Sequence, residues 1–364
     1  MRGRRIPSWW RLAVVMGLAL AGLQVGLSWG QAGPTVDAAM RRQVIDGVVR
    51  EMTAHYVFPE VAARVEAALR DPARRAPLDG LTDGVTLAQA MTTLLQAVTG
   101  DKHVRLRFSV QPLPDDRPGG PSAAQLAAFK DEQRARNFGV ERVERLPGNI
   151  GLIELRGFAP AEWAGASVAA AMTLVAHTDA LIVDLRRNGG GDPATVALVS
   201  SYLFDERTHL NTMHFRDGNR TEQFWTQDWV SGPRFGQAKP VYVLTSSRTF
   251  SGAEEFSYNL QALKRGTVVG EVTGGGAHPG GDRKVATHFR LFVPGGRAVN
   301  PITRTNWEGR GVQPDVAVKA DDALRVAQVQ ALQRLLPVQP EGPQRQAIAA
   351  RLAELDGGAA RRSP

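Results

Sequence analysis

The sequence predicts an α/β protein, because apolar strands and helical segments alternate through its central part. Two strings, "ALIVDL" (180–185) and "PVYVLT" (240–245), are almost entirely apolar, as strands covered on both faces are. A helical pattern follows each of them after a short loop. This alternation predicts a mostly parallel sheet, with functional side chains at the C-terminal ends of its strands.

The remaining elements are expected in the following order along the chain. Residues 37–100 carry apolar side chains at helical spacing between prolines, which predicts an N-terminal helical bundle. A core over residues 101–320 begins with the strand "DKHVRLRF" (101–108), and residues 111–146 form an exposed connection carrying one helix. Further strands are expected in "IGLIEL" and "TVVGE", and a hairpin turn at Gly295 and Gly296. Residues 321–364 read as a helical tail.

The first 30 residues have the pattern of an export signal. Arginines precede an uncharged apolar stretch, and "SWG" (28–30) offers small residues at a cleavage site. The stretch is also long enough to span a bilayer, so an uncleaved membrane anchor is the alternative. We therefore expect a periplasmic or secreted protein that contacts a membrane only if this segment stays attached.

Charge and composition exclude several classes of protein. The net charge is +8, and four of the arginines lie within residues 1–30, which contain no acid. The remaining excess is spread along the chain without the basic blocks of a nucleic-acid groove, so no nucleic-acid partner is expected. The absence of cysteine excludes disulfides, a cysteine nucleophile and thiolate metal sites.

Ser251 is the first candidate for chemistry, in the string "SSRTFSGAEEF" (246–256). It follows a buried strand and begins a helix, where free amides favour negative charge, and Gly252 could supply an amide to an oxyanion. The same residues also fit a capping box in which Glu254 returns a hydrogen bond.

A second glycine loop, "DLRRNGGGDP" (184–193), could add an amide from Gly189 or Gly190, or could be a plain left-handed turn. It matches no nucleotide-binding motif, and no metal-binding spacing occurs in the chain, so we expect neither cofactor nor metal.

A serine nucleophile needs a base, and two histidines are placed to serve. His103 stands at the start of a predicted strand, and His278 lies in the glycine loop "VVGEVTGGGAHPG". Glu308, in "NWEGRGVQPDV", could orient a histidine or could be a surface carboxylate paired with Arg310.

Taken in order, these strings and "NFGVERVERLPGNIGLIELRGF" resemble the carboxyl-terminal-processing and tricorn-like serine peptidases over residues 37–320. The branch that includes modules of interphotoreceptor retinoid-binding protein is the most similar. The resemblance implies a crotonase-like or ClpP-like α/β core behind the helical bundle. It further implies Ser251 as nucleophile, His103 as general base, Glu308 as its orienting carboxylate, and an oxyanion hole from amides of Gly252, Gly189 and Gly190.

Two positions depart from the family's patterns. Members with a Ser-Lys dyad carry a lysine where this chain has Gly276, so a Ser/His/Glu site is expected instead. Tricorn-like members carry a serine before the histidine, and here Lys102 stands in its place with no evident role, since an ammonium cannot accept a hydrogen bond.

The expected function is that of an exported serine endopeptidase acting on peptides or proteins through an acyl-enzyme. Retinoid-binding modules on the same scaffold make a non-catalytic carrier of apolar ligands the alternative. An acyl-CoA enzyme on a crotonase-like core is a third reading, which the Ser/His/Glu set does not favour.

Overall fold

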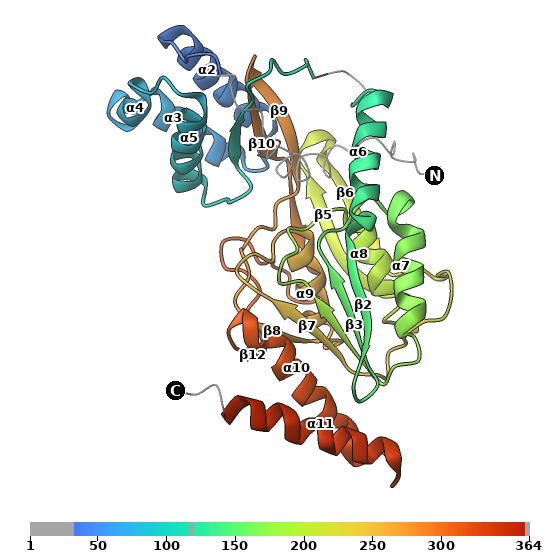
Figure 1. Cartoon of the computed structure of the whole chain (residues 1–364). Coiled ribbons are helices and arrows are strands. Elements are labelled where there is room, and N and C mark those ends of the chain that lie inside the picture. Colours follow the sequence, from blue (N-terminus) through green and yellow to red (C-terminus); the bar gives the residue numbers. More distant parts are fainter. Residues whose placement is uncertain (1–32, 117–119, 361–364) are drawn as a thin grey trace. The chain divides into compact units, whose positions relative to one another are not determined.

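The computed structural model describes residues 33–116 and 120–360, so the expected export signal lies outside the described residues. The chain divides into two compact units, which alternate along the sequence (Figure 1). Of the described residues, the first unit comprises 33–116, 120–129, 212–222 and 276–299, and the second comprises 130–211, 223–275 and 300–360. Within the described ranges, no helix is long and apolar enough to cross a membrane.

Four helices and a small antiparallel sheet build the first unit. The helices are α2 (Ala38–His55), α3 (Pro59–Arg70), α4 (Pro72–Asp79) and α5 (Gly84–Thr99). The strands are β1 (Arg105–Phe108), β9 (Gly280–Ala286) and β10 (Phe289–Pro294), in the order β1-β10-β9. The helices and strands share one apolar core, in which Met52, Leu69 and Phe289 are fully buried.

Local sequence explains where these helices start and stop. Asp37 caps α2 by accepting a hydrogen bond from Met40 N at 2.7 Å, and Asp83 does the same for α5 through Thr86 N. Gly100 ends α5 in the left-handed conformation that glycine adopts without cost. In α2, a side chain at Gly47 would collide with the main chain of Val285, so glycine is required where the helix meets β9. The predicted helical bundle is confirmed, with one more helix, α4, than the apolar pattern indicated.

A six-stranded sheet forms the centre of the second unit, in the order β12-β8-β7-β4-β3-β2. Its strands pair in parallel except at the β2–β3 edge. They are β2 (Val140–Leu146), β3 (Ile150–Leu155), β4 (Ala180–Asp184), β7 (Val241–Thr245), β8 (Thr267–Gly270) and β12 (Val316–Ala317). The predicted α/β class with a mostly parallel sheet is therefore confirmed.

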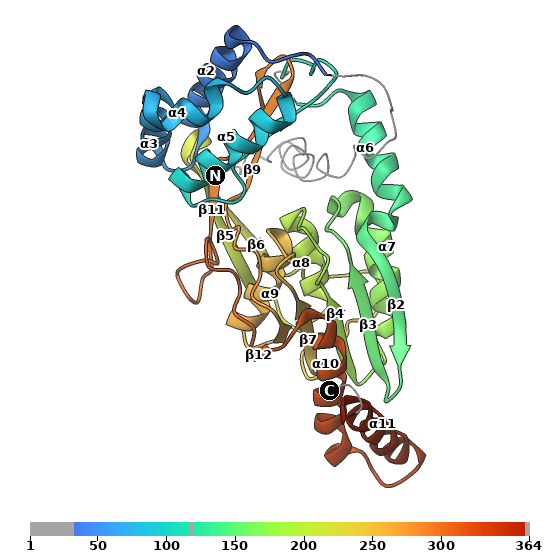
Figure 2. The same cartoon turned by 60° about the vertical axis from the view of Figure 1, so that its left-hand side comes forward.

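Helices cover both faces of this sheet (Figures 1 and 2). Helices α7 (Ala161–Val175), α8 (Pro193–Ser201) and α9 (Gly252–Ala262) share an apolar core with one face. Helices α10 (Ala320–Leu335) and α11 (Pro343–Ala360), the predicted helical tail, pack on the other. Burial on both faces explains why β4 and β7 lack polar alternation.

Two expectations were wrong in detail. Gly295 and Gly296 do not make a hairpin turn, because β10 pairs with β9 and β1, whereas β11 (Gly296–Val299) pairs with β5 (His209–Phe215). Strand β5 lies between β11 and β6 (Arg220–Trp225) in a separate antiparallel sheet. The connection at 111–146 carries the expected helix, α6 (Ala123–Ala135), but its end is the edge strand β2. Single-turn helices complete the fold at 137–139, 217–219 and 336–338.

Candidate active site

Ser251 lies in the sharp turn between β7 and α9, in the second unit. Its backbone has φ +53° and ψ −119°, a conformation that non-glycine residues rarely adopt. Such strain persists only where surrounding contacts enforce it, and it is typical of nucleophiles on strand-to-helix turns. Gly252 is the first residue of α9, where main-chain amides lack intrahelical acceptors.

The glycine loop after β4 lies directly against this turn. A side chain on Gly190, whose φ is +105°, would lie 2.7 Å from Gly252 N and 2.8 Å from Ser251 Cβ. Asn188 fastens the two segments, because its carbonyl accepts from Phe250 N at 3.1 Å and its side chain accepts from Gly190 N at 2.8 Å. The loop and the turn at Ser251, called the nucleophile turn below because Ser251 is the candidate nucleophile, therefore form one closely packed surface.

Glu254 joins the nucleophile turn to the segment that follows β8. One carboxylate oxygen accepts from Ser251 N at 2.8 Å, which is the return bond that the capping-box pattern predicts. The other accepts from Thr273 Oγ1 at 2.5 Å and from Gly275 N at 2.6 Å. Glu254 is fully buried, so these three donors are what offsets the loss of its hydration. The conformation of Ser251 is thus held by a side chain three residues further along.

Glu308 stands in a turn that is bound to the same segment. Thr273 Oγ1 accepts from Val312 N at 2.6 Å, and Gly275 O accepts from Gly309 N at 3.1 Å. The Glu308 side chain is half-buried beside the buried Trp307. Thr273 was not singled out from the sequence, because a lone threonine in a glycine loop gives no signal of its two side-chain hydrogen bonds.

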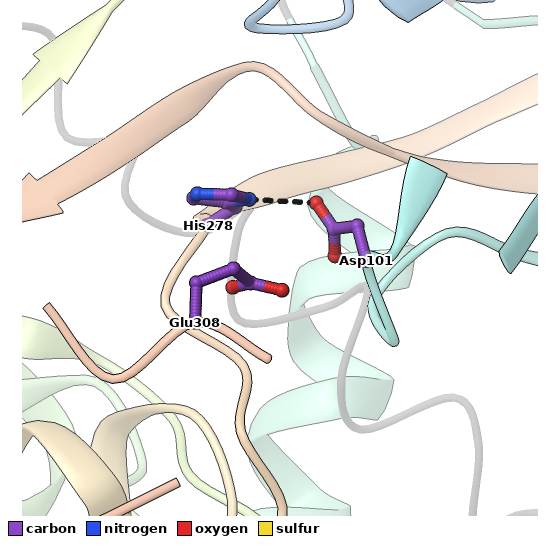
Figure 3. A group of neighbouring side chains, drawn as sticks. All are labelled: Asp101, His278 and Glu308. Carbon is purple, nitrogen blue, oxygen red and sulfur yellow. Dashed lines mark hydrogen bonds and ion pairs between the residues drawn. The ribbon is translucent and has the colours of Figure 1, made fainter. Parts of the chain in front are cut away.

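The two candidate histidines lie in the first unit and share one carboxylate. Asp101 accepts from His103 N at 2.9 Å with one oxygen, and its other oxygen is 2.8 Å from His278 Nδ1 (Figure 3). Tyr56 donates to that second oxygen at 3.2 Å. Because a carboxylate only accepts, His278 donates through Nδ1, which leaves Nε2 as the acceptor when the ring is neutral.

Burial sets the charges in this cluster. It lowers the pKa of His103 to about 4, although the charge of Asp101 works in the opposite direction, so His103 is neutral near pH 7. For Asp101 burial alone would raise the pKa, but the hydrogen bond from His278 and the charges of both histidines lower it overall. The His103 ring also stacks on Phe292, with 5.7 Å between ring centroids. The cluster therefore combines a carboxylate with a neutral imidazole.

The predicted site residues are thus distributed over both units. Ser251, Gly252, Gly189, Gly190 and Glu308 belong to the second unit, and the structure brings the first four together around one turn. The first unit contains His103, His278 and Lys102, of which Lys102 is exposed. Asp101, His278 and Glu308 are of residue types that bind divalent metals.

Comparison with known proteins gives a family match for the central part of the chain. Residues 149–318 match the model of peptidase family S41. This match covers 170 of the 364 residues and agrees with the family that the sequence resembles.

Several solved structures are similar to this chain. A lipoprotein from Streptococcus agalactiae is similar over 85% of this chain and 100% of its own, with a TM-score of 0.51 and 14% identity. The photosystem II D1 C-terminal processing protease matches over 79% of this chain and 94% of its own, at TM-score 0.46 and 17% identity. Tricorn protease matches over 87% of this chain and 37% of its own, at TM-score 0.45 and 14% identity.

Proposed function

We propose that this chain is an exported serine endopeptidase with Ser251 as its nucleophile, His103 as general base and Glu308 as orienting carboxylate. His103 takes the proton of Ser251 Oγ while the oxygen attacks a peptide carbonyl, and the imidazolium then gives that proton to the leaving amine. Water hydrolyses the acyl-enzyme by the reverse proton transfers. The observation that carries the proposal is the strained turn at Ser251, with the glycine loop packed against it.

The oxyanion would be held by main-chain amides of the two packed segments. Gly252 N lies in the first turn of α9, where the helix dipole favours negative charge. Of the two glycines expected from the other loop, Gly190 already donates its N–H to Asn188. We therefore favour Gly189 over Gly190 as the second donor. Removing one oxyanion donor costs roughly 10²–10³-fold in rate in other serine peptidases.

A histidine base suits this chain better than a lysine. The position of the Ser-Lys lysine is Gly276, and the neighbouring lysine, Lys284 of β9, is 2.8 Å from Asp115 in an ion pair. His103 is neutral near pH 7, which a proton acceptor must be. His278 is the second candidate base, because it has a carboxylate on Nδ1, as triad histidines do.

The proposal that the enzyme is exported rests on the sequence. The arginine-led apolar stretch at residues 1–30 supports a periplasmic or secreted enzyme, anchored only if that segment stays attached. The alternative function is that of a carrier for apolar ligands on the same scaffold.

Hydrolysis of fluorescein-labelled casein separates a peptidase from a carrier. We expect the parent chain to release fluorescent peptides and Ser251→Ala to lose several powers of ten in rate. Ser247→Ala is the matched control, since Ser247 is an exposed serine four residues away, and it should cleave at the parent rate. A parent chain without hydrolysis, or Ser251→Ala with undiminished hydrolysis, would contradict the proposal.

A further inference from the structure

Helix α9 begins with two adjacent glutamates whose surroundings are opposite. Glu254 accepts three hydrogen bonds, whereas Glu255 is 2% exposed and its Oε1 has no hydrogen-bond partner among the described residues. The side chain of Asn211, in β5, acts on the Glu255 carboxyl. Burying an ionised carboxylate with so few hydrogen-bond donors costs free energy, so burial favours the protonated form of Glu255.

The charge that acts on Glu255 comes from Asp192, which is itself 2% exposed. Asp192 ends the glycine loop and caps α8 by accepting from Ala194 N at 2.8 Å. Its own N–H donates to Phe158 O at 2.8 Å. From β5, Asn211 is uncharged, and the nearby His209 bonds to the Asn211 carbonyl at 3.1 Å. On its own helix, Glu254 is engaged by Ser251 and the segment after β8.

Asp192 is connected to the nucleophile through the loop that it ends. Gly191 precedes it, and Gly190 before that is in contact with Ser251 and Gly252. The loop and the turn are packed so closely that no side-chain atom could be added at Gly190. A shift of Asp192 by about an ångström would therefore move the loop away from the place where an oxyanion must be held, and misplacement on this scale costs about 10²-fold in rate.

We propose that Glu255 is a positioning residue of the peptidase: its protonated carboxyl lets Asp192 hold the glycine loop against the nucleophile turn. Once Glu255 ionises, its charge and that of the buried Asp192 repel each other, and this repulsion displaces the loop that Asp192 ends. The inference rests on the proposed function, since it concerns the same nucleophile.

The pH dependence follows from the surroundings of Glu255. Burial raises its pKa to about 8, and the charge of Asp192 raises it further, whereas the side chain of Asn211 acts in the opposite direction. Glu255 is therefore protonated at neutral pH, and activity should decline above about pH 8, by tenfold per pH unit at most. In the unfolded chain this carboxyl ionises near pH 4.5, so its contribution to stability is fully present below about pH 4.5 and is lost as the pH rises from there to about 8.

The test is the rate at which a fluorophosphonate labels Ser251 between pH 5 and 10. The parent chain should label about tenfold more slowly at pH 9 than at pH 7, whereas Glu255→Gln, which stays neutral, should label at the parent rate at pH 7 and keep that rate at pH 9. Glu162→Gln, at an exposed position in the first turn of α7, is the matched control and should follow the parent. An unchanged alkaline decline in Glu255→Gln would overturn the inference.

A second measurement needs no variant. Infrared difference spectra of the parent chain should lose a buried protonated-carboxyl band with the same midpoint as the loss of labelling. A parent chain whose Ser251 labels equally fast at pH 7 and 9 contradicts the role of Glu255 but leaves the proposed function intact. Absence of labelling at every pH contradicts both.

Discussion

The nucleophile turn of the second unit and the histidine cluster of the first unit are fixed in different ways. Main-chain contacts hold the conformation at Ser251. They are the close approach of Gly190, the hydrogen bonds that Asn188 accepts, and the hydrogen bond that Ser251 N–H donates to Glu254. Around His103 and His278, it is carried by burial and by one shared carboxylate, Asp101. The nucleophile turn therefore depends most on the glycine at position 190, whereas the histidine cluster depends most on the charge of Asp101.

The largest expected effect distinguishes the two histidines of the cluster. If His103 is the base, His103→Ala should lose about 10³-fold or more in kcat/KM. His278→Ala should lose less, about 10- to 100-fold, because it affects catalysis through Asp101 and thus through the His103 main chain. Casein hydrolysis with melting curves for both variants gives the measurement. The reverse ranking would assign the base to His278.

Gly190→Ala tests the close packing at the nucleophile turn. Its added Cβ would lie within 3.0 Å of Gly252 N, Ser251 Cβ and Phe250 O, and its φ of +105° disfavours any side chain. We expect a loss of about 10²-fold in kcat/KM and roughly 1–3 kcal/mol in stability. Gly189→Ala is the control, because no atom lies within 4 Å of its added Cβ and an alanine keeps the N–H. Equal activities of the two variants would contradict the packing argument.

Thr273→Val tests the bond between the nucleophile turn and the Glu308 turn. The substitution leaves the buried Glu254 carboxylate and Val312 N without their hydroxyl partner, which should cost about 1–3 kcal/mol of stability and roughly tenfold in kcat. Thr273→Ser keeps the hydroxyl and should retain most of both. Urea unfolding and casein hydrolysis measure the two effects, and a fully active, stable valine variant would show that the bond is dispensable.

The smallest effect concerns the pH dependence of stability on the acidic side. His103 has a pKa of about 4 in the fold against about 6.5 in the unfolded chain, so the unfolded chain binds the proton more readily. Its contribution is fully present above pH 6.5 and is lost as the pH falls towards 4, by roughly 3 kcal/mol at most. His103→Gln should flatten the unfolding free energy over this interval. An unchanged slope would show that His103 is not held neutral by burial.

Much of the second unit could be predicted from the sequence, because its signals are local. Apolar runs identified β4 and β7, and the pattern at Ser251 indicated a helix start with a returning glutamate. The resemblance to the peptidase family supplied the expected roles of Ser251 and Glu308. These features are determined by residues that are adjacent in the chain or that lie in the same sheet.

Other features could not be predicted, because they depend on long-range pairing. Strands β5 and β11 pair across 81 or more residues, as Phe215 and Gly296 do, and no local pattern marks that partner. The Asp101–His278 bond joins residues 177 apart in sequence. The burial of Glu255 was missed for the same reason, since a glutamate in a first helical turn usually faces water.

Mass mapping of a fluorophosphonate adduct tests the central claim, that Ser251 is an activated nucleophile. The account predicts one modified peptide, carrying the probe on Ser251, and a slower reaction in His103→Ala. Labelling of another serine such as Ser246, or no labelling of a folded chain, would contradict it.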